Sequence, residues 1–301
     1  MNNDYYCGLN NHGNTCFFNS AIQSLMRCSV FINFISNIHI DHELIKIFQD
    51  FIIEYKKNSN KSISPVNLIK YYERRNKYYK RGSQDDADEV ITFLIGDIDD
   101  IIKDVIKKNP EKNVIIKGDI TIDKMMSYLF GVVIRTTNKC LKCSKKSYYD
   151  VTEFMIRLPI KVNNLEENLI NYSKVEEMNG ECQYECSYCK EKVDGLKCDQ
   201  IIKTPKYLHI QLKRFENDGR TRSKINSNVN IPYKLNITDN KYNLRGFVHH
   251  MGSINGGHYI YNYNKNKLED SNNWICLNDS GISTTNIGSD LNKGFVYLFV
   301  K

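Results

Sequence analysis

The sequence contains no uninterrupted apolar run that approaches the roughly 20 residues a membrane-spanning helix needs. Its first residues, MNNDYYCGLN, lack the basic start and apolar stretch of a secretory signal peptide. Internal repeats and low-complexity linkers are also absent. We therefore expect a soluble protein of a reducing intracellular compartment, the cytoplasm or the nucleus, that has no membrane partner. In such a compartment the ten cysteines favour metal ligation or thiol chemistry over disulfides.

The net charge of the chain excludes few classes of binding partner. A net charge of +7 over 301 residues is too diffuse to indicate a nucleic-acid partner. The densest basic stretch, Lys70 to Arg81 (KYYERRNKYYKR), interleaves its cations with tyrosines. A solvated helix whose tyrosines pack inward is a commoner origin of that pattern than a nucleic-acid surface. We expect a monomer that does not bind nucleic acid.

The order of the expected elements indicates an α+β fold. Hydrophobic spacing predicts four helices in the first third of the chain, over residues 16–34, 43–55, from Pro65 onward, and 84–107. Strand-like runs follow, separated by clusters of Gly, Asn and Ser, at residues 130–136, 154–160, 207–214, 242–249, 258–263 and 294–300.

Two C-x-x-C pairs, Cys140 with Cys143 and Cys186 with Cys189, lie in polar, lysine-rich turns. Zinc takes four thiolates in a closed tetrahedral structural site, and two such turns supply them. We therefore predict one structural zinc ion that staples a strand-rich excursion with little core of its own. Free thiols or a redox pair are the alternative, although neither pair clearly sits between a strand and a helix. Cys182 and Cys198 flank the second pair and could replace one of its ligands.

Cys16 follows a Gly-Asn-Thr turn and begins an apolar helical run, FFNSAIQSLMRC. The helix dipole and the unpaired N–H groups there are expected to lower the pKa of a thiol and to make it a nucleophile. Those N–H groups, with the side chain of Asn11 or Asn14, could also stabilise an oxyanion. Taken alone, Cys16 would more often be an inert buried cysteine.

A histidine later in the chain changes that interpretation. His258 follows two glycines and begins the expected strand HYIYNY. The stretch WICLND comes next and ends in Asn278 and Asp279. Either side chain could accept the imidazole N–H and set its tautomer.

These stretches, taken together and in order, resemble the ubiquitin-specific protease family of deubiquitinating enzymes, which are cysteine peptidases with a papain-like core. The resemblance covers nearly the whole chain and rests on these segments: GLNNHGNTCFFNSAIQSL, GSQDDADEVITFL, YECSYC, PKYLHIQLKRF, GFVHHMGSINGGHYIYNY and WICLNDS. It implies that residues 1–301 form a single catalytic domain. Within that domain we expect a mainly helical thumb at 1–125, zinc-stapled β fingers within 130–210, and an antiparallel β palm with the histidine motif at 205–301.

The resemblance also implies roles for individual residues. Cys16 would be the nucleophile, His258 the general base, Asn278 the residue that orients the imidazole, Asn11 the oxyanion donor and Asp279 an assisting acid. Asp86 and Glu89 would bind the arginine-containing tail of ubiquitin, although an acidic first helical turn alone would explain them. Gly257 and Tyr259, on either side of the histidine, are further expected substrate contacts. The chain departs from the family pattern at Phe17, Phe18 and Asp85.

The implied function is hydrolysis of the isopeptide or peptide bond after the C-terminal Gly-Gly of ubiquitin. The expected partners are accordingly ubiquitin or ubiquitinated proteins. Three alternatives remain open: a module that binds a ubiquitin-like modifier without turnover, a protease specific for another such modifier, and a zinc-ribbon nucleic-acid binder. The last leaves the cysteine and histidine motifs unexplained.

Overall fold

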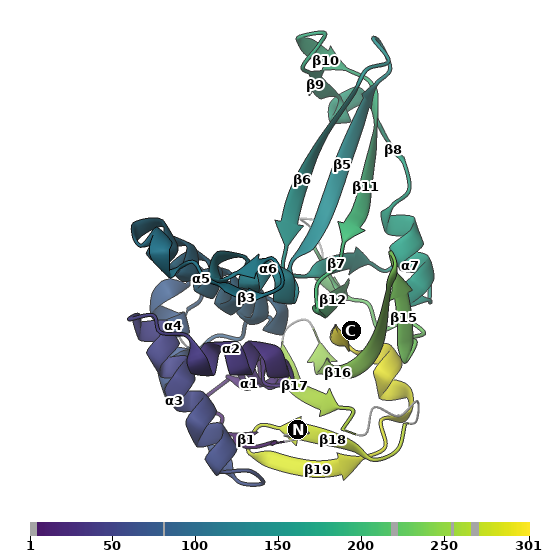
Figure 1. The fold of residues 1–301 in the computed structure, drawn as a ribbon. Coiled ribbons are helices and arrows are strands. Elements are labelled where there is room, and N and C mark those ends of the chain that lie inside the picture. The colour runs from purple at the N-terminus through teal and green to yellow at the C-terminus, as the bar shows by residue number, and fades with distance from the viewer. Residues whose placement is uncertain (1–4, 81, 218–221, 254–255, 266–270) are drawn as a thin grey trace.

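The computed structural model describes residues 5–80, 82–217, 222–253, 256–265 and 271–301. The α+β expectation is confirmed, since helices dominate the first part and antiparallel strands the rest (Figure 1). The helices are α1 (Cys16–Leu25), α2 (Ser29–Asn37), α3 (Glu43–Lys57), α4 (Val66–Arg75), α5 (Ala87–Lys108), α6 (Met125–Phe130) and α7 (Leu165–Tyr172). Two small pairs of strands accompany them: β1 (Gly8–Leu9) with β2 (Ser62–Ile63), and β3 (Ile115–Lys117) with β4 (Ile120–Thr121).

The largest sheet has eight strands, in the order β19-β18-β17-β16-β20-β12-β7, with β15 paired to β16. All of its pairs are antiparallel except that of β7 with β12. Its strands are β7 (Ile156–Pro159), β12 (Tyr207–Lys213), β15 (Lys234–Ile237), β16 (Asn240–Ser253), β17 (Gly256–Tyr263), β18 (Trp274–Asn278), β19 (Gly281–Thr285) and β20 (Val296–Val300). Beside it, β13 (Phe215–Asn217) pairs with β14 (Arg222–Lys224).

A second sheet rises away from the body of the molecule (Figure 1). It has the order β6-β5-β11-β8, and the β9–β10 hairpin lies at its tip. Its strands are β5 (Val132–Cys140), β6 (Lys146–Glu153), β8 (Glu176–Met178) and β11 (Gly195–Lys203), and the hairpin strands are β9 (Tyr184–Cys186) and β10 (Glu191–Val193). Many of its side chains are exposed, including Tyr148, Tyr149 and Val151 of β6. Apolar burial therefore does little to hold the tip together.

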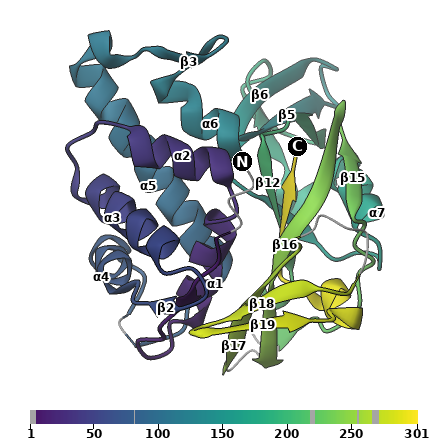
Figure 2. The ribbon, with the colours of Figure 1, turned by 60° about the horizontal axis from the view of Figure 1, so that its bottom comes forward.

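Helix α1 lies between the other helices and the large sheet (Figure 2). All ten of its residues are buried, because its faces contact both α5 and β17. A helix covered on every side has a fixed position. The start of α1 is therefore held firmly against β17, the strand that carries His258.

Several of the expected element boundaries are wrong, among them the start of the fourth helix, which lies at Ala87 and not at residue 84. The first helix does not continue to residue 34. Backbone hydrogen bonds of the i to i+3 type follow Leu25 and end α1 there, and α2 begins at Ser29. The buried Arg27 occupies the break, where its guanidinium donates to the Tyr55 hydroxyl at 2.7 Å and lies over the Tyr263 ring. The strand expected from Phe130 begins at Val132, since Phe130 still belongs to α6.

Residues 70–75 of the basic stretch belong to α4 and form a solvated helix as expected, but the helix ends at Arg75 and Tyr78 beyond it is fully exposed. Tyr71 and Tyr72 are buried, while Arg74 and Arg75 pair with Glu43 and Asp97. Arg81, the last residue of that stretch, lies outside the described residues, as do residues 1–4 at the start of the chain. Within the described part, no helix combines the length and the apolarity needed to cross a membrane.

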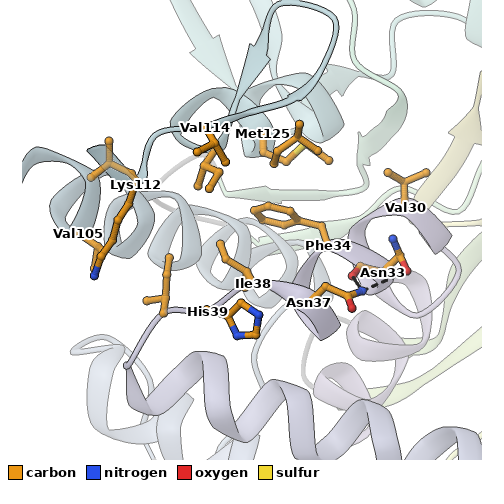
Figure 3. A pocket seen from close by; sticks show the side chains of 14 residues that line it. Val30, Asn33, Phe34, Asn37, Ile38, His39, Val105, Lys112, Val114 and Met125 are labelled. Carbon is orange, nitrogen blue, oxygen red and sulfur yellow. Dashed lines mark hydrogen bonds between the residues drawn. The ribbon is translucent and has the colours of Figure 1, made fainter. Parts of the chain in front are cut away.

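The helical half also contains a cavity of about 680 Å³ (Figure 3). It lies between α2, the C-terminal end of α5 and the β3–β4 hairpin, and its walls are mostly apolar. Phe34, Ile38 and Met125 contribute to it, and His39 and Lys112 are the ionisable groups among its lining residues. None of the residues predicted for the functional site lines this cavity.

Candidate active site

Cys16 is the first residue of α1, and only 2% of its surface is exposed. Helix α1 packs against β17, and the backbone of Tyr259 on that strand is near enough to the thiol to lower its pKa. The residue beside Tyr259 on that strand is His258. A sulfur from the beginning of the chain therefore lies against the strand that carries the imidazole.

The expectation of a lowered thiol pKa is wrong for the free protein. Burial raises the pKa of Cys16 above its ordinary value, and the negative charge of Asp279 raises it further. Backbone hydrogen bonds from Tyr259 and Phe17 oppose this rise without reversing it. The sequence suggested the helix terminus but not the depth of burial, and desolvation is the largest influence on this pKa. Ionisation of this thiol therefore needs a base.

His258 and Asn278 lie on the adjacent strands β17 and β18. Their side chains are joined by a hydrogen bond of 2.7 Å between His258 Nε2 and Asn278 Oδ1. An amide oxygen only accepts, so Nε2 carries the proton and Nδ1 is left as the basic nitrogen. Within the described residues no hydrogen bond joins His258 to Cys16, and Asn278 is the side-chain partner of the ring.

Asp279 has a different partner from Asn278. Its two carboxylate oxygens accept from Asn11 Nδ2 at 2.9 Å and from Asn19 Nδ2 at 2.7 Å. Asp279 itself adopts a left-handed backbone conformation (φ 49°), which turns its side chain away from the direction taken by Asn278. The sequence left open which of the two groups faces the imidazole, and in the structure it is Asn278.

The amide of Asn11 is held in one orientation. Its Oδ1 accepts from the backbone N–H groups of Gly13 and Thr15, while one N–H of its Nδ2 donates to Asp279. The other N–H of the amide remains free to donate. Asn14, the other asparagine considered, instead donates to the carbonyl of Gly82 at 2.9 Å. Asn11, unlike Asn14, is linked through Asp279 to Asn19 of α1, the helix that Cys16 begins.

The acidic residues at the start of α5 have partners within the chain. Asp86 accepts from the Tyr259 hydroxyl at 2.5 Å, and Glu89 pairs with Arg157 at 3.6 Å. Glu89 is 58% exposed, so its carboxylate remains accessible to a ligand. Asp86 is half-buried, and burial raises its pKa. The contact of Asp86 with Tyr259 brings two predicted substrate-binding residues together across the gap between helices and sheet.

Sequence reasoning missed Asp88, Asn19 and Gln84. Asn19 supports Asp279, as described above, and Gln84 hydrogen-bonds to the backbone of Gly257. Gln84 and Asp88 lie inside the quoted motif GSQDDADEVITFL, and Asn19 lies inside GLNNHGNTCFFNSAIQSL, so these two motifs were the available signals. Contacts between residues so far apart in the chain cannot be read from a motif.

Asp88 supplies a pH-dependent prediction. Its buried carboxyl has a pKa raised to about 7, first by desolvation and then by the neighbouring charge of Asp86, despite an ion pair with Arg157 at 3.3 Å. The folded state thus binds this proton more tightly than the unfolded state, whose pKa is near 4. Stability is lost as the pH rises from about 4 to about 7.

Asp88→Asn is therefore expected to raise the free energy of unfolding by up to about 4 kcal/mol at pH 8, about 1.4 kcal/mol for each of three pKa units, and to change it little at pH 4. Denaturant unfolding at the two pH values measures this difference. Asp100→Asn, an exposed position on the same helix, is the matched control. Equal effects of Asp88→Asn at both pH values would contradict the assignment.

The four predicted metal ligands meet at the tip of the second sheet. The sulfur atoms of Cys140, Cys143, Cys186 and Cys189 all lie within 4.8 Å of one another. The closest cross-pairs, Cys140 with Cys189 and Cys143 with Cys186, are 3.9 Å apart. That separation is far too long for a disulfide. It is close to the roughly 3.8 Å between tetrahedral thiolates that lie ~2.3 Å from a zinc ion. These four cysteines could hold a metal ion.

The turns around this cluster also suit a metal. The backbone N–H of the last cysteine in each pair donates to the first sulfur, at 3.3 Å in Cys143 and 3.5 Å in Cys189. Cys182 is exposed and outside the cluster, and Cys198 donates to the Ser173 carbonyl elsewhere. Neither of them competes for the site.

Comparison with known proteins places the chain in a family. The sequence model of the family described as ubiquitin carboxyl-terminal hydrolase matches residues 7–299. The chain therefore belongs to the ubiquitin carboxyl-terminal hydrolase family, whose members are cysteine-type deubiquitinating enzymes.

Individual relatives carry the same family name. The chain is 26% identical to Arabidopsis thaliana ubiquitin carboxyl-terminal hydrolase 16, over 97% of the chain and 30% of that protein. It is 29% identical to human ubiquitin carboxyl-terminal hydrolase 42, over 97% of the chain and 22% of that protein. It thus spans less than a third of the length of these two relatives. Arabidopsis ubiquitin carboxyl-terminal hydrolase 4 is 25% identical, and the match covers 92% of the chain and 84% of that protein.

Proposed function

We propose that this protein is a deubiquitinase that hydrolyses the isopeptide or peptide bond after the C-terminal Gly-Gly of ubiquitin. The observation that carries the proposal is the placement of the His258–Asn278 pair on β17 and β18, the strand pair against which α1 holds Cys16. A thiol, an imidazole and an orienting amide are the groups that thiol-dependent hydrolysis requires. The family supports ubiquitin as the substrate.

The geometry supports a specific sequence of proton movements. Because burial keeps the Cys16 thiol protonated, His258 Nδ1 takes its proton as the sulfur attacks the carbonyl carbon. The free N–H of Asn11 and the backbone N–H groups at the start of α1 donate to the oxyanion. His258 then protonates the leaving amine, and a thioester forms on Cys16. The imidazole finally removes a proton from water, which cleaves the thioester and releases the carboxylate.

Asp279 supports this chemistry through Asn11. Its carboxylate fixes the amide that donates to the oxyanion, so we assign it a positioning role. Asn278 keeps Nδ1 basic by accepting from Nε2. An amide stabilises the imidazolium less than a carboxylate would, because it carries no charge.

We further propose that the four-cysteine cluster binds one zinc ion. A closed site of four thiolates supplies a structural crosslink and has no open coordination position for catalysis. The crosslink would stiffen the β5–β6–β11 sheet, which would serve as fingers that hold the globular body of ubiquitin. The helical part at 1–125 would act as a thumb and the strands at 205–301 as a palm, to which β7 adds an edge strand. Asp86 and Glu89 would bind the arginines of the ubiquitin tail.

Labelling with a ubiquitin whose C-terminus carries a vinyl electrophile tests the proposed function. We expect one covalent adduct per chain, mapped by peptide mass spectrometry to Cys16. Matched probes built on other ubiquitin-like modifiers should label more slowly. Labelling by one of those probes alone would reassign the substrate, and an adduct at another cysteine would contradict the nucleophile.

Asn278→Ala is expected to lower kcat for a fluorogenic ubiquitin substrate at least about tenfold while leaving KM nearly unchanged. The imidazole loses its orientation in this variant, but no group in contact with the body of ubiquitin changes. Asn286→Ala serves as the control, because that exposed asparagine bonds to Asn272 and not to the site. An unchanged kcat in Asn278→Ala would transfer the orienting role to Asp279.

A further inference from the structure

Strand β17 has an edge that no strand covers in the described part of the chain. On one side β17 pairs with β16 along its whole length, from Gly256 to Tyr263. On the other side β18 pairs only with residues 261–263. The backbone groups of residues 256–260 on that second edge therefore have no strand partner. An unpaired strand edge is a template for another extended chain.

One side chain occupies this edge. Gln84 Nε2 donates to the Gly257 carbonyl at 2.8 Å, and the Gly257 N–H donates to Gln84 Oε1 at 3.3 Å. A carboxamide has the same donor and acceptor as a peptide group. Gln84 thus makes with Gly257 the pair of reciprocal hydrogen bonds that a residue of a neighbouring strand would make.

The occupied position lies directly beside the candidate nucleophile. Alternate residues of a strand turn their backbone groups to the same edge, so those of Gly257 and Tyr259 point the same way. Helix α1 packs against β17, with the Tyr259 backbone near the Cys16 thiol, and two strand residues span roughly 7 Å. An extended chain paired with Gly257 would consequently carry its next peptide group or two to the sulfur.

Close packing against β16 fixes the direction in which the backbone groups of Gly257 point. A Cβ on Gly257 would lie 2.2 Å from His250 Nε2 and 2.4 Å from the Met251 carbonyl oxygen, so the strand is packed tightly from its β16 side. Gln84, in contrast, is exposed and precedes α5. Its two hydrogen bonds are solvent-accessible and can be exchanged at small cost.

We propose that Gln84 is a displaceable clasp that occupies the backbone position on β17 where the extended C-terminal tail of the substrate pairs. This inference rests on the proposed function for the identity of the substrate. The tail must remove the carboxamide before its own backbone binds Gly257. Productive binding then requires a substrate segment that forms both backbone hydrogen bonds with Gly257 in place of Gln84. Peptide segments that cannot form both bonds bind less well.

Two measurements on the full-length protein test the clasp. The first is hydrogen exchange of the Gly257 amide by NMR without substrate, which we expect to be at least about threefold faster in Gln84→Ala, because that N–H loses its acceptor. The second is calorimetric binding of ubiquitin to Cys16→Ala and to Cys16→Ala/Gln84→Ala. We expect the second protein to bind about three- to tenfold more tightly, the effect of one or two exposed hydrogen bonds. Asn286→Ala, which removes an exposed carboxamide outside the fingers that bonds to Asn272, should change neither quantity.

The outcomes separate this inference from the proposed function. Unchanged exchange at Gly257, or an affinity that is unchanged or weaker in Gln84→Ala, overturns the clasp alone. Failure of the Cys16→Ala protein to bind ubiquitin overturns the proposed function and with it the substrate named here. In that case the exchange rate at Gly257 still decides whether Gln84 closes the strand edge.

Discussion

Cys16→Ala is expected to reduce hydrolysis of a fluorogenic ubiquitin substrate by about a factor of 10⁴ or more. Removing the sulfur leaves the imidazole with nothing to deprotonate and the carbonyl with no nucleophile. Ubiquitin affinity should persist, because the thiol contributes little to the surface that contacts a folded partner. Calorimetry with ubiquitin and single-turnover hydrolysis together separate binding from chemistry.

The control for this substitution is Cys28→Ala. Cys28 is also buried, lies in the turn between α1 and α2, and donates to the Ser24 carbonyl at 3.7 Å. Cys28→Ala also removes a buried sulfur atom, so it measures the loss of turnover that comes from packing alone. Cys16→Ala turnover comparable with that of Cys28→Ala would exclude Cys16 as the nucleophile.

Cys186→Ser is expected to remove the metal from the purified protein and to unfold the tip of the second sheet. The buried residues at the tip form only a small cluster, Cys140, Cys186 and Val193, so almost no apolar burial remains once the crosslink is lost. Zinc stoichiometry should fall from about one per chain to near zero. Hydrogen exchange across β9 and β10 should accelerate by at least about a hundredfold, while the large sheet keeps its protection.

Cys182→Ser is the matched control, because Cys182 is an exposed cysteine close to the cluster but not part of it. It should retain both the metal and the exchange protection. A chelator added to the unaltered protein should reproduce the effect of Cys186→Ser, and restored zinc should reverse it. Full metal content in Cys186→Ser would show that another residue completes the site.

The sequence alone determined the features that depend on local pattern. The helical period of the apolar residues in 84–107 predicted α5, because burial of one face requires that period. The repeated C-x-x-C spacing predicted which four sulfurs converge, since each short turn brings its own two thiols together. The run that begins at His258 predicted a strand, which is the C-terminal part of β17, and the motifs in their order predicted the family. The strand at Trp274 was not among the expected strands.

Tertiary structure alone decided how these segments act on one another. The pKa of Cys16 rises because α1 is buried against β17, and no local pattern reports that depth. Asn278 faces the imidazole while Asp279 turns to Asn11, because a left-handed backbone at Asp279 separates two neighbouring side chains. Gln84 meets Gly257 only when helices and sheet pack together. Hydrogen bonding and desolvation depend on distance in space, and the sequence encodes those distances only through the whole fold.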